Sequence, residues 1–194
     1  IIDPKTDKVL YEVRIPRDKA LKIVKIAREK NLSLNVYMDQ FTFYTERPNQ
    51  YSILDAQLNE VDIQIVKDIE KIIEYDPLKL MFVDEPGVIS RLEENFSSYD
   101  GDLVAFTSLP QFLEIVNRSA TKADALKWIA NRFNIKREEV VAIGDSHNDI
   151  PMLEWAGIGV AMGNADDKVK GAADFITLSN REDGVAHAIE KLIK

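Results

Sequence analysis

Hydrophobic and polar positions alternate with different periods along the chain, and these periods predict its helices and strands. Apolar residues recur at helical spacing between Arg17 and Lys30, directly after Pro16. β-Branched and aromatic residues dominate Leu32–Tyr37 and Phe41–Tyr44, which predicts a β-hairpin. Similar patterns predict strands over Lys8–Val13 and Lys79–Val83, helices over Pro48–Leu58, Val66–Ile73 and Val88–Phe96, and a strand pair over Leu103–Phe106 and Phe112–Val116. This stretch therefore mixes helices with closely spaced strands, as an α+β module does.

The pattern changes after Asn117. One face of Thr121–Phe133 is apolar, and the uniformly apolar run Val140–Ile143 follows it. A helix that leads into a buried strand is typical of a parallel sheet. The pattern continues with a helix from about Ile150 to Ala156, a strand over Ile158–Ala161, a helix over Asp166–Lys170, a strand at Phe175–Ile176 and a helix over Val185–Ile193. The last third is therefore predicted to be α/β.

Composition narrows the class of protein. The 194 residues carry a net charge of −8 with no marked basic run, which argues against binding to nucleic acid or to an anionic membrane surface. No apolar stretch approaches the ~20 residues that span a bilayer, and no signal peptide opens the sequence. The absence of cysteine excludes disulfides and thiolate metal sites, and two histidines make a histidine-built metal site a poor choice. We expect a cytoplasmic protein.

Candidate chemistry is concentrated directly after the predicted strand Val140–Ile143. Asp145, Asn148 and Asp149 follow it within a few residues, at the edge where open parallel sheets bind their ligands. An alternative role for Asp149 is to cap the helix that Pro151 helps to start. Helix capping by Asp149 gives Asp145 no structural role. Oxygen donors of this kind suit Mg²⁺, which takes one or two carboxylates together with phosphate oxygens and water.

Lys122 is a second candidate because of its place in a helix. If Thr121 caps the helix and Asp124 is its acidic partner, Lys122 lies in the first turn, where the helix dipole disfavours a cation by ~0.3–1 kcal/mol. A nearby negative group, such as a bound phosphate, would remove this conflict. A merely solvated lysine is the alternative, and only the combination with Asp145 and Asp149 favours a phosphate site.

Five segments together resemble the haloacid dehalogenase superfamily, and more closely its Cof-type sugar-phosphatase subfamily. They are Ser119–Leu126, Gly144–Leu153, Gly157–Ala165, Lys170–Thr177 and Glu182–Ala186. The resemblance implies an α/β fold: residues 117–194 as the C-terminal part of a Rossmann-type parallel-sheet core, residues 13–116 as an inserted α+β cap that selects the substrate, and residues 1–12 as a ribbon of the core.

The resemblance also implies an activity and roles for residues. It implies a Mg²⁺-dependent phosphatase that acts on a small phosphorylated metabolite, such as a sugar phosphate, through an aspartyl-phosphate. Lys122 corresponds to the lysine that holds the nucleophile and the phosphoryl group, and Asp145 to the Mg²⁺ ligand. Asn148 would contact phosphate, and Asp149 would orient Lys122 and metal-bound water. The metal and the lysine would neutralise the oxygens of the transferring group.

The family's nucleophile motif, Asp-x-Asp-Gly-Thr after an apolar strand, is absent from these residues. Its nearest imitation, Asp84-Glu85-Pro86-Gly87, has Pro86 where the family has a general acid. The sequence also does not begin with Met, so we expect a fragment that is inactive alone and lacks the N-terminal part of the core. The missing strand would lie beside Val140–Ile143, and we expect the exposed edge to be covered by that segment or by a neighbouring chain.

Two other functions stay open at this point. A fragment without the nucleophile could be a catalytically silent module that binds a phosphorylated metabolite. A phosphomutase would use the same covalent chemistry with a sugar as the acceptor. The sequence does not identify the substrate or the oligomeric state.

Overall fold

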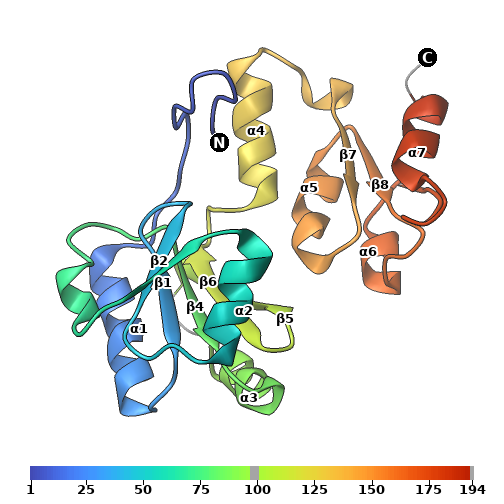
Figure 1. Cartoon of the computed structure of the whole chain (residues 1–194). Coiled ribbons are helices and arrows are strands. Elements are labelled where there is room, and N and C mark those ends of the chain that lie inside the picture. Colours follow the sequence, from blue (N-terminus) through green and yellow to red (C-terminus); the bar gives the residue numbers. More distant parts are fainter. Residues whose placement is uncertain (97–100, 193–194) are drawn as a thin grey trace. The chain divides into compact units, whose positions relative to one another are not determined.

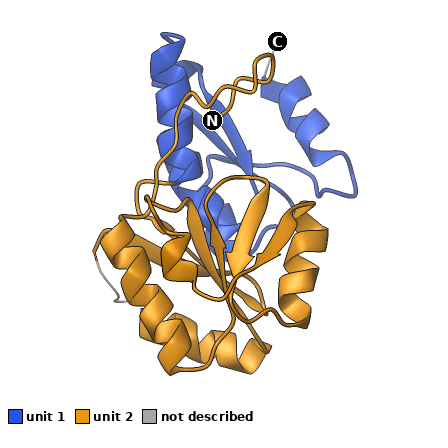
Figure 2. Cartoon of the chain, turned by 60° about the vertical axis from the view of Figure 1, so that its left-hand side comes forward, with its two compact units in different colours: residues 1, 121–194 blue, residues 2–120 orange. Residues whose placement is uncertain are grey.

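The structure is a computed structural model that describes residues 1–96 and 101–192. The chain divides into two compact units, shown in Figure 2. Unit 2 consists of residues 2–120, and unit 1 consists of Ile1 together with residues 121–194. Each unit is described by itself. The division of the chain into a core ribbon, a cap and the C-terminal part of a core stays a prediction.

Unit 2 is built on a mixed sheet with the strand order β3-β2-β1-β4-β6-β5. All neighbouring strands are antiparallel except β2 and β3, which are parallel and are connected through α2. Figure 1 shows these strands with their helices. The strands are β1 Leu34–Tyr37, β2 Thr42–Thr45, β3 Asp62–Ile65, β4 Lys79–Val83, β5 Leu103–Leu109 and β6 Phe112–Asn117. The helices are α1 Arg17–Glu29, α2 Gln50–Asn59 and α3 Pro86–Phe96.

The two faces of this sheet are covered by different helices. Helices α1 and α3 pack on one face, where Ile23, Phe82 and Ile89 belong to a common apolar cluster. Helix α2 covers part of the other face through Leu54, which packs near the buried ring of Phe43. The apolar spacing of α1 turns Ala20, Ile23, Val24 and Ala27 toward the sheet, as its sequence predicts.

A buried polar cluster lies between α2 and the sheet. The Asp55 carboxylate is fully buried and accepts hydrogen bonds from Asn35 Nδ2 at 2.7 Å, from the Tyr37 hydroxyl at 2.5 Å and from Asn59 Nδ2 at 2.8 Å. Burial and the neighbouring Asp55 raise the pKa of Tyr37, so this hydroxyl stays protonated and donates. The cluster gives a buried carboxylate three donors, as burial of a charged group requires.

Unit 1 contains a parallel sheet with the strand order β7-β8-β9, within the part of the chain that is described. Helix α5 contacts β7 and β8, and α4 contacts α5. The core is made mostly of small side chains, among them Ala130, Ala142, Ala156 and Ala161. The elements are α4 Lys122–Arg132, β7 Val141–Gly144, α5 Ile150–Trp155, β8 Ile158–Ala161, α6 Asp167–Gly171, β9 Phe175–Ile176 and α7 Gly184–Leu192.

Two predicted elements are wrong. Lys8–Val13 forms no strand: the structure has only an isolated bridge between Ile2 and Val9, and Val9 and Leu10 are exposed. The predicted helix Val66–Ile73 contains a single 3₁₀ turn, Ile69–Lys71, after the unpredicted strand β3. At Lys8–Val13 the alternating pattern predicts a strand, but no strand of the described residues pairs along it.

The other predicted helices and strands form within a few residues of their expected bounds. The predicted end of the last helix, Ile193, lies outside the described residues. The α/β fold class is therefore confirmed. Among residues 1–96 and 101–192, no helix has the length and apolarity needed to cross a membrane.

Candidate phosphate and metal site

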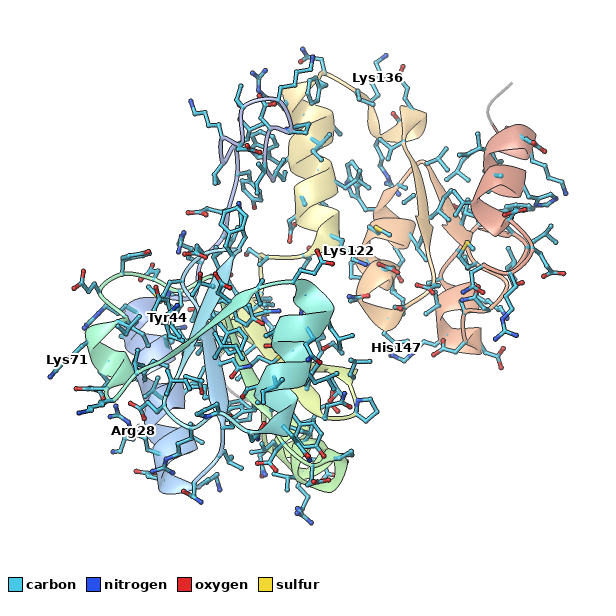
Figure 3. The ribbon with its side chains drawn as sticks, in the orientation of Figure 1. Arg28, Tyr44, Lys71, Lys122, Lys136 and His147 are labelled. Atoms are coloured by element: carbon cyan, nitrogen blue, oxygen red, sulfur yellow. The ribbon has the colours of Figure 1, made fainter. Side chains whose placement is uncertain are left out.

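The candidate residues lie at the carboxyl end of the parallel sheet of unit 1. Strands β7 and β8 run in the same direction, so the loops that follow Gly144 and Ala161 leave the same edge. Lys122 begins α4 at this end. Figure 3 shows Lys122 and His147 at one end of unit 1 and Lys136 at the other. The topology therefore brings residues from separate segments to one edge, as open parallel sheets do at their ligand sites.

Lys122 and Asp149 form an ion pair at the carboxyl end of this sheet. Lys122 Nζ lies 2.5 Å from Asp149 Oδ1, and the Asp149 side chain is 4% exposed while that of Lys122 is 54% exposed. The other carboxylate oxygen, Oδ2, accepts the backbone N–H of Asp145 at 3.0 Å and that of Ser146 at 3.1 Å. Asp149 thus holds the lysine with one oxygen and the loop with the other.

This pair also accounts for the position of the lysine in its helix. Thr121 caps α4, since its Oγ1 accepts the N–H of Asp124, so Lys122 occupies the first turn as predicted. The expected negative partner is supplied by Asp149 itself, and no bound phosphate is needed to remove the conflict with the helix dipole. Asp149 does not cap α5 with its side chain; its hydrogen bonds go to the preceding loop.

The pKa of Asp149 reflects these contacts. Burial raises this pKa, but the Lys122 ammonium and the backbone N–H groups of Ser146 and Asp145 outweigh burial, so that the net pKa is lowered from its ordinary value. The carboxylate therefore stays charged in its buried position. A charged Asp149 keeps the ammonium of Lys122 in place, while about half of the lysine side chain stays open to solvent.

Gly144 makes room for Asp149. A Cβ added to Gly144 would lie 2.5 Å from the Asp149 Cβ and 2.9 Å from its Oδ2. Real Cβ atoms do not approach other atoms so closely, so any side chain at position 144 would displace the carboxylate. Gly144 therefore leaves the space that the Asp149 side chain occupies at the end of β7.

Asp145 differs from Asp149 in having neutral partners and an exposed side chain. Its Oδ1 accepts the Ser146 hydroxyl at 3.2 Å, and its Oδ2 accepts the Asn164 amide at 3.2 Å. Within residues 1–96 and 101–192, Asp145 forms no ion pair. A solvent-facing carboxylate that no cation neutralises is suited to binding one.

Asn148 and His147 occupy the 3₁₀ turn between Asp145 and Asp149. Asn148 is exposed, and its side chain has no hydrogen-bond partner in the described part of the chain. His147 Nε2 lies 2.5 Å from Asp166 Oδ2, at the start of α6. The Val169 N–H and His147 lower the pKa of Asp166. The histidine thus contacts a neighbouring loop, while Asn148 is free to meet a ligand.

The donors at this edge are hard oxygen and amide groups, which fit Mg²⁺ better than a softer metal. Yet no group of three or more acidic or histidine side chains that could enclose a metal occurs among the described residues. Asp145 alone would supply one ligand, and Mg²⁺ commonly takes its others from water and phosphate oxygens. The residues present therefore fit part of a magnesium site.

The site contains one residue that the sequence did not single out, Asn164. It belongs to the loop after β8, at the same sheet edge as Asp145. A polar residue directly after a parallel strand was the available signal, but only the fold shows that its amide reaches Asp145. The roles predicted for Lys122, Asp145, Asn148 and Asp149 stay predictions; the structure gives their positions.

The chain belongs to the haloacid dehalogenase-like hydrolase family, whose model matches residues 1–189. The predicted resemblance to this superfamily is thereby confirmed. Among the relatives is the phosphatase YwpJ of Bacillus subtilis (strain 168), which is 34% identical over 192 residues, spanning 83% of this chain and 67% of that protein.

Solved structures agree with this assignment. A haloacid dehalogenase-like hydrolase from Bacteroides thetaiotaomicron has a TM-score of 0.86 and 36% identity, over 99% of this chain and 73% of that one. A protein from Thermotoga maritima, TM0651, has a TM-score of 0.83 and 32% identity, over 97% of this chain and 71% of that one.

Proposed function

We propose that this chain is part of a Mg²⁺-dependent phosphatase of the Cof-like group, which hydrolyses the phosphate monoester of a small metabolite such as a sugar. The observation that carries this proposal is the Lys122–Asp149 pair, which lies at the carboxyl end of a parallel sheet beside the carboxylate of Asp145. A cation and a potential metal ligand at one strand edge provide what a phosphoryl group needs for charge neutralisation. Membership of the hydrolase family supports the same activity.

Each residue has a defined task in this proposal. Lys122 binds phosphoryl oxygens with its exposed ammonium, and Asp149 keeps that ammonium in place. Asn148 donates its side-chain amide to the phosphate. Asp145 holds Mg²⁺, which when bound would withdraw charge from the transferring group. The overall reaction replaces the bond between phosphorus and the alcohol oxygen by one to a water oxygen, and it releases the alcohol and phosphate.

The 194 residues contain no Asp-x-Asp-Gly-Thr sequence, so these groups bind and polarise a phosphate without a carboxylate nucleophile of that motif. We therefore expect the isolated chain to bind phosphate esters without turning them over. The whole gene product that contains this chain is the form expected to be active. Residues 13–116, which belong to unit 2, are proposed as its substrate-selecting cap.

The test compares the isolated chain with the gene product that contains it. With an aryl phosphate and Mg²⁺, the gene product should release phosphate, and the isolated chain should not. Asp145→Asn in the gene product should abolish the Mg²⁺-dependent rate. Undiminished activity of this variant would refute the metal assignment. Isomerised sugar phosphate without free phosphate would instead indicate a mutase, and binding without turnover in the gene product a silent binding module.

A further inference from the structure

We infer that Asn164 is a positioning residue for Asp145: it holds the carboxylate of Asp145 in the orientation that binds the cation. This inference rests on the proposed function, because Asp145 is the cation ligand only there. Asn164 Nδ2 donates to Asp145 Oδ2 at 3.2 Å. Ser146 donates to the other oxygen, so that each carboxylate oxygen has one neutral donor.

The orientation of the Asn164 amide is fixed by a second contact. Its Oδ1 accepts the backbone N–H of Asn180 at 2.9 Å. A backbone N–H can only donate, so the carbonyl oxygen of the amide must face Asn180 and the NH₂ group must face Asp145. A flipped amide would lose the bond to Asn180 and turn its oxygen toward a carboxylate. The side chain is therefore set as a donor to Asp145.

These contacts join three separate segments. Asp145 follows β7, Asn164 follows β8, and Asn180 lies between β9 and α7. The chain of bonds from Asn180 through Asn164 to Asp145 thus spans the carboxyl edge of the sheet. In a loop with an exposed carboxylate, such a tether restricts the rotation of the side chain before any ligand arrives. Partners that orient a metal ligand typically change metal affinity about 10–100-fold when they are removed.

A solely structural role for Asn164 is the competing explanation, in which the amide secures the loop that contains Asn180 and Asp145 is incidental. The two explanations differ in how Asn164 responds to the metal. A positioning residue is coupled to the cation through Asp145, so its side-chain amide responds when the carboxylate binds Mg²⁺. A residue that only secures a loop has no such coupling.

The first experiment measures Mg²⁺ binding by calorimetry, without substrate, to the gene product that contains this chain. We expect Asn164→Ala to weaken binding about 10–100-fold and to leave the unfolding temperature of the metal-free protein unchanged. Asn180→Ala is the matched control: it removes the side chain of a neighbouring loop asparagine but keeps the backbone N–H, so it should bind within about twofold of the wild type.

The second experiment follows side-chain amides by NMR in the wild-type protein, with variants used only for assignment and as a control. The NH₂ pair of Asn164, assigned by its loss in Asn164→Ala, should shift along the Mg²⁺ titration with the calorimetric midpoint. The NH₂ pair of Asn180 should not shift. In Asp145→Asn, the Asn164 pair should stay constant.

The outcomes separate this inference from the proposed function. Tight Mg²⁺ binding by the wild type, loss in Asp145→Asn and wild-type affinity in Asn164→Ala would overturn the inference alone. Failure of the wild type to bind Mg²⁺ would overturn the metal assignment, and the inference with it. Weakened binding in Asn164→Ala together with the NMR response would support both.

Discussion

At the scale of single residues, Asp149 combines two tasks that usually fall to different side chains. One of its oxygens pairs with Lys122, and the other accepts the N–H groups of Asp145 and Ser146. Three donors compensate the desolvation of a nearly buried carboxylate. Loss of the lysine would leave the charge with only the two backbone donors.

Lys122→Met should therefore destabilise unit 1 by about 1–3 kcal/mol at pH 7, the usual cost of removing one partner of a buried charged acceptor. Because the pKa of Asp149 is lowered in the folded state, the contribution of this pair is present above the ordinary value of 3.8 and is lost as the pH falls through the lowered pKa. Denaturant unfolding at several pH values should show the difference from the wild type narrowing below pH ~4.

Lys127→Met is the control for this prediction. Lys127 lies on the same helix and pairs with Asp124 at 3.4 Å, with both side chains substantially exposed. Exposed pairs contribute little, so this variant should stay within ~0.5 kcal/mol of the wild type. Equal losses in the two variants would show that charge on α4, and not the buried pair, determines the effect.

The sequence predicts neighbouring site residues only where they lie close together along the chain, in a loop after a predicted strand. Asp145 and Asp149 are separated by three residues after an apolar strand, so their shared loop is readable without a structure. The partner of Lys122 is 27 positions away, and its proximity follows because α4 begins at the end of the sheet where β7 ends. Asn164 lies in an ordinary Gly-Asn-Ala segment, and its hydrogen bond to Asp145 depends on the strand register.

At the scale of elements, the buried Asp55 cluster fixes how α2 sits on its sheet. Tyr37→Phe removes the hydroxyl that donates to Asp55 at 2.5 Å while keeping the ring, so it should destabilise unit 2 by about 1–3 kcal/mol. Tyr44→Phe is the matched control on the neighbouring strand β2, because the Tyr44 hydroxyl has no hydrogen-bond partner in the described residues. Urea unfolding followed by far-UV circular dichroism measures both variants.

The end of β7 allows another test. Gly144→Ala should displace Asp149 and destabilise unit 1 by about 1–3 kcal/mol, as overpacking commonly does. Gly171→Ala, at the end of α6, meets nothing within 4 Å, and alanine is the better helix former, so it should be neutral or stabilising by up to ~1 kcal/mol. A destabilised Gly171→Ala with an unchanged Gly144→Ala would contradict the steric argument.

Elements were predicted correctly where periodicity and burial agree. In α1 the apolar stripe faces the sheet, and β4 is an apolar run that is buried along most of its length. Strand β3 was missed although its four residues, Asp-Ile-Gln-Ile, alternate between polar and apolar and pair with β2; the stretch is short, and most of its side chains are exposed. Lys8–Val13 shows the reverse error: alternation is present, but no neighbouring strand in the described part of the chain pairs along it.

At the scale of the whole molecule, the two units have separate cores, which differ in the size of their buried side chains. Unit 2 buries large side chains such as Phe82, Ile89 and Leu113, whereas the core of unit 1 is rich in alanine. Apolar burial stabilises by about 25 cal/mol per Å², so alanines contribute much less than leucine or phenylalanine. We expect unit 1 to be the less stable unit of the isolated chain.

Both tryptophans, Trp128 and Trp155, belong to unit 1, on α4 and α5. Tryptophan fluorescence therefore follows the unfolding of unit 1, while far-UV circular dichroism follows both units. In a urea titration the fluorescence transition should have a lower midpoint than the main dichroism transition. Coincident midpoints would mean that the units unfold together.

Like Gly144, Gly159 on β8 is crowded: an added Cβ would lie 2.4 Å from the Leu153 carbonyl oxygen. The crowding at Gly159 comes from the backbone of Leu153, whereas the crowding at Gly144 comes from the side chain of Asp149. Descendants of this protein that lost phosphatase activity would be free to replace Asp145 or Asn148, yet would still have to retain Gly159 in order to fold, and Gly144 for as long as Asp149 is kept. Inactive paralogues should therefore be recognisable by these glycines even where Asp145 and Asn148 have been replaced.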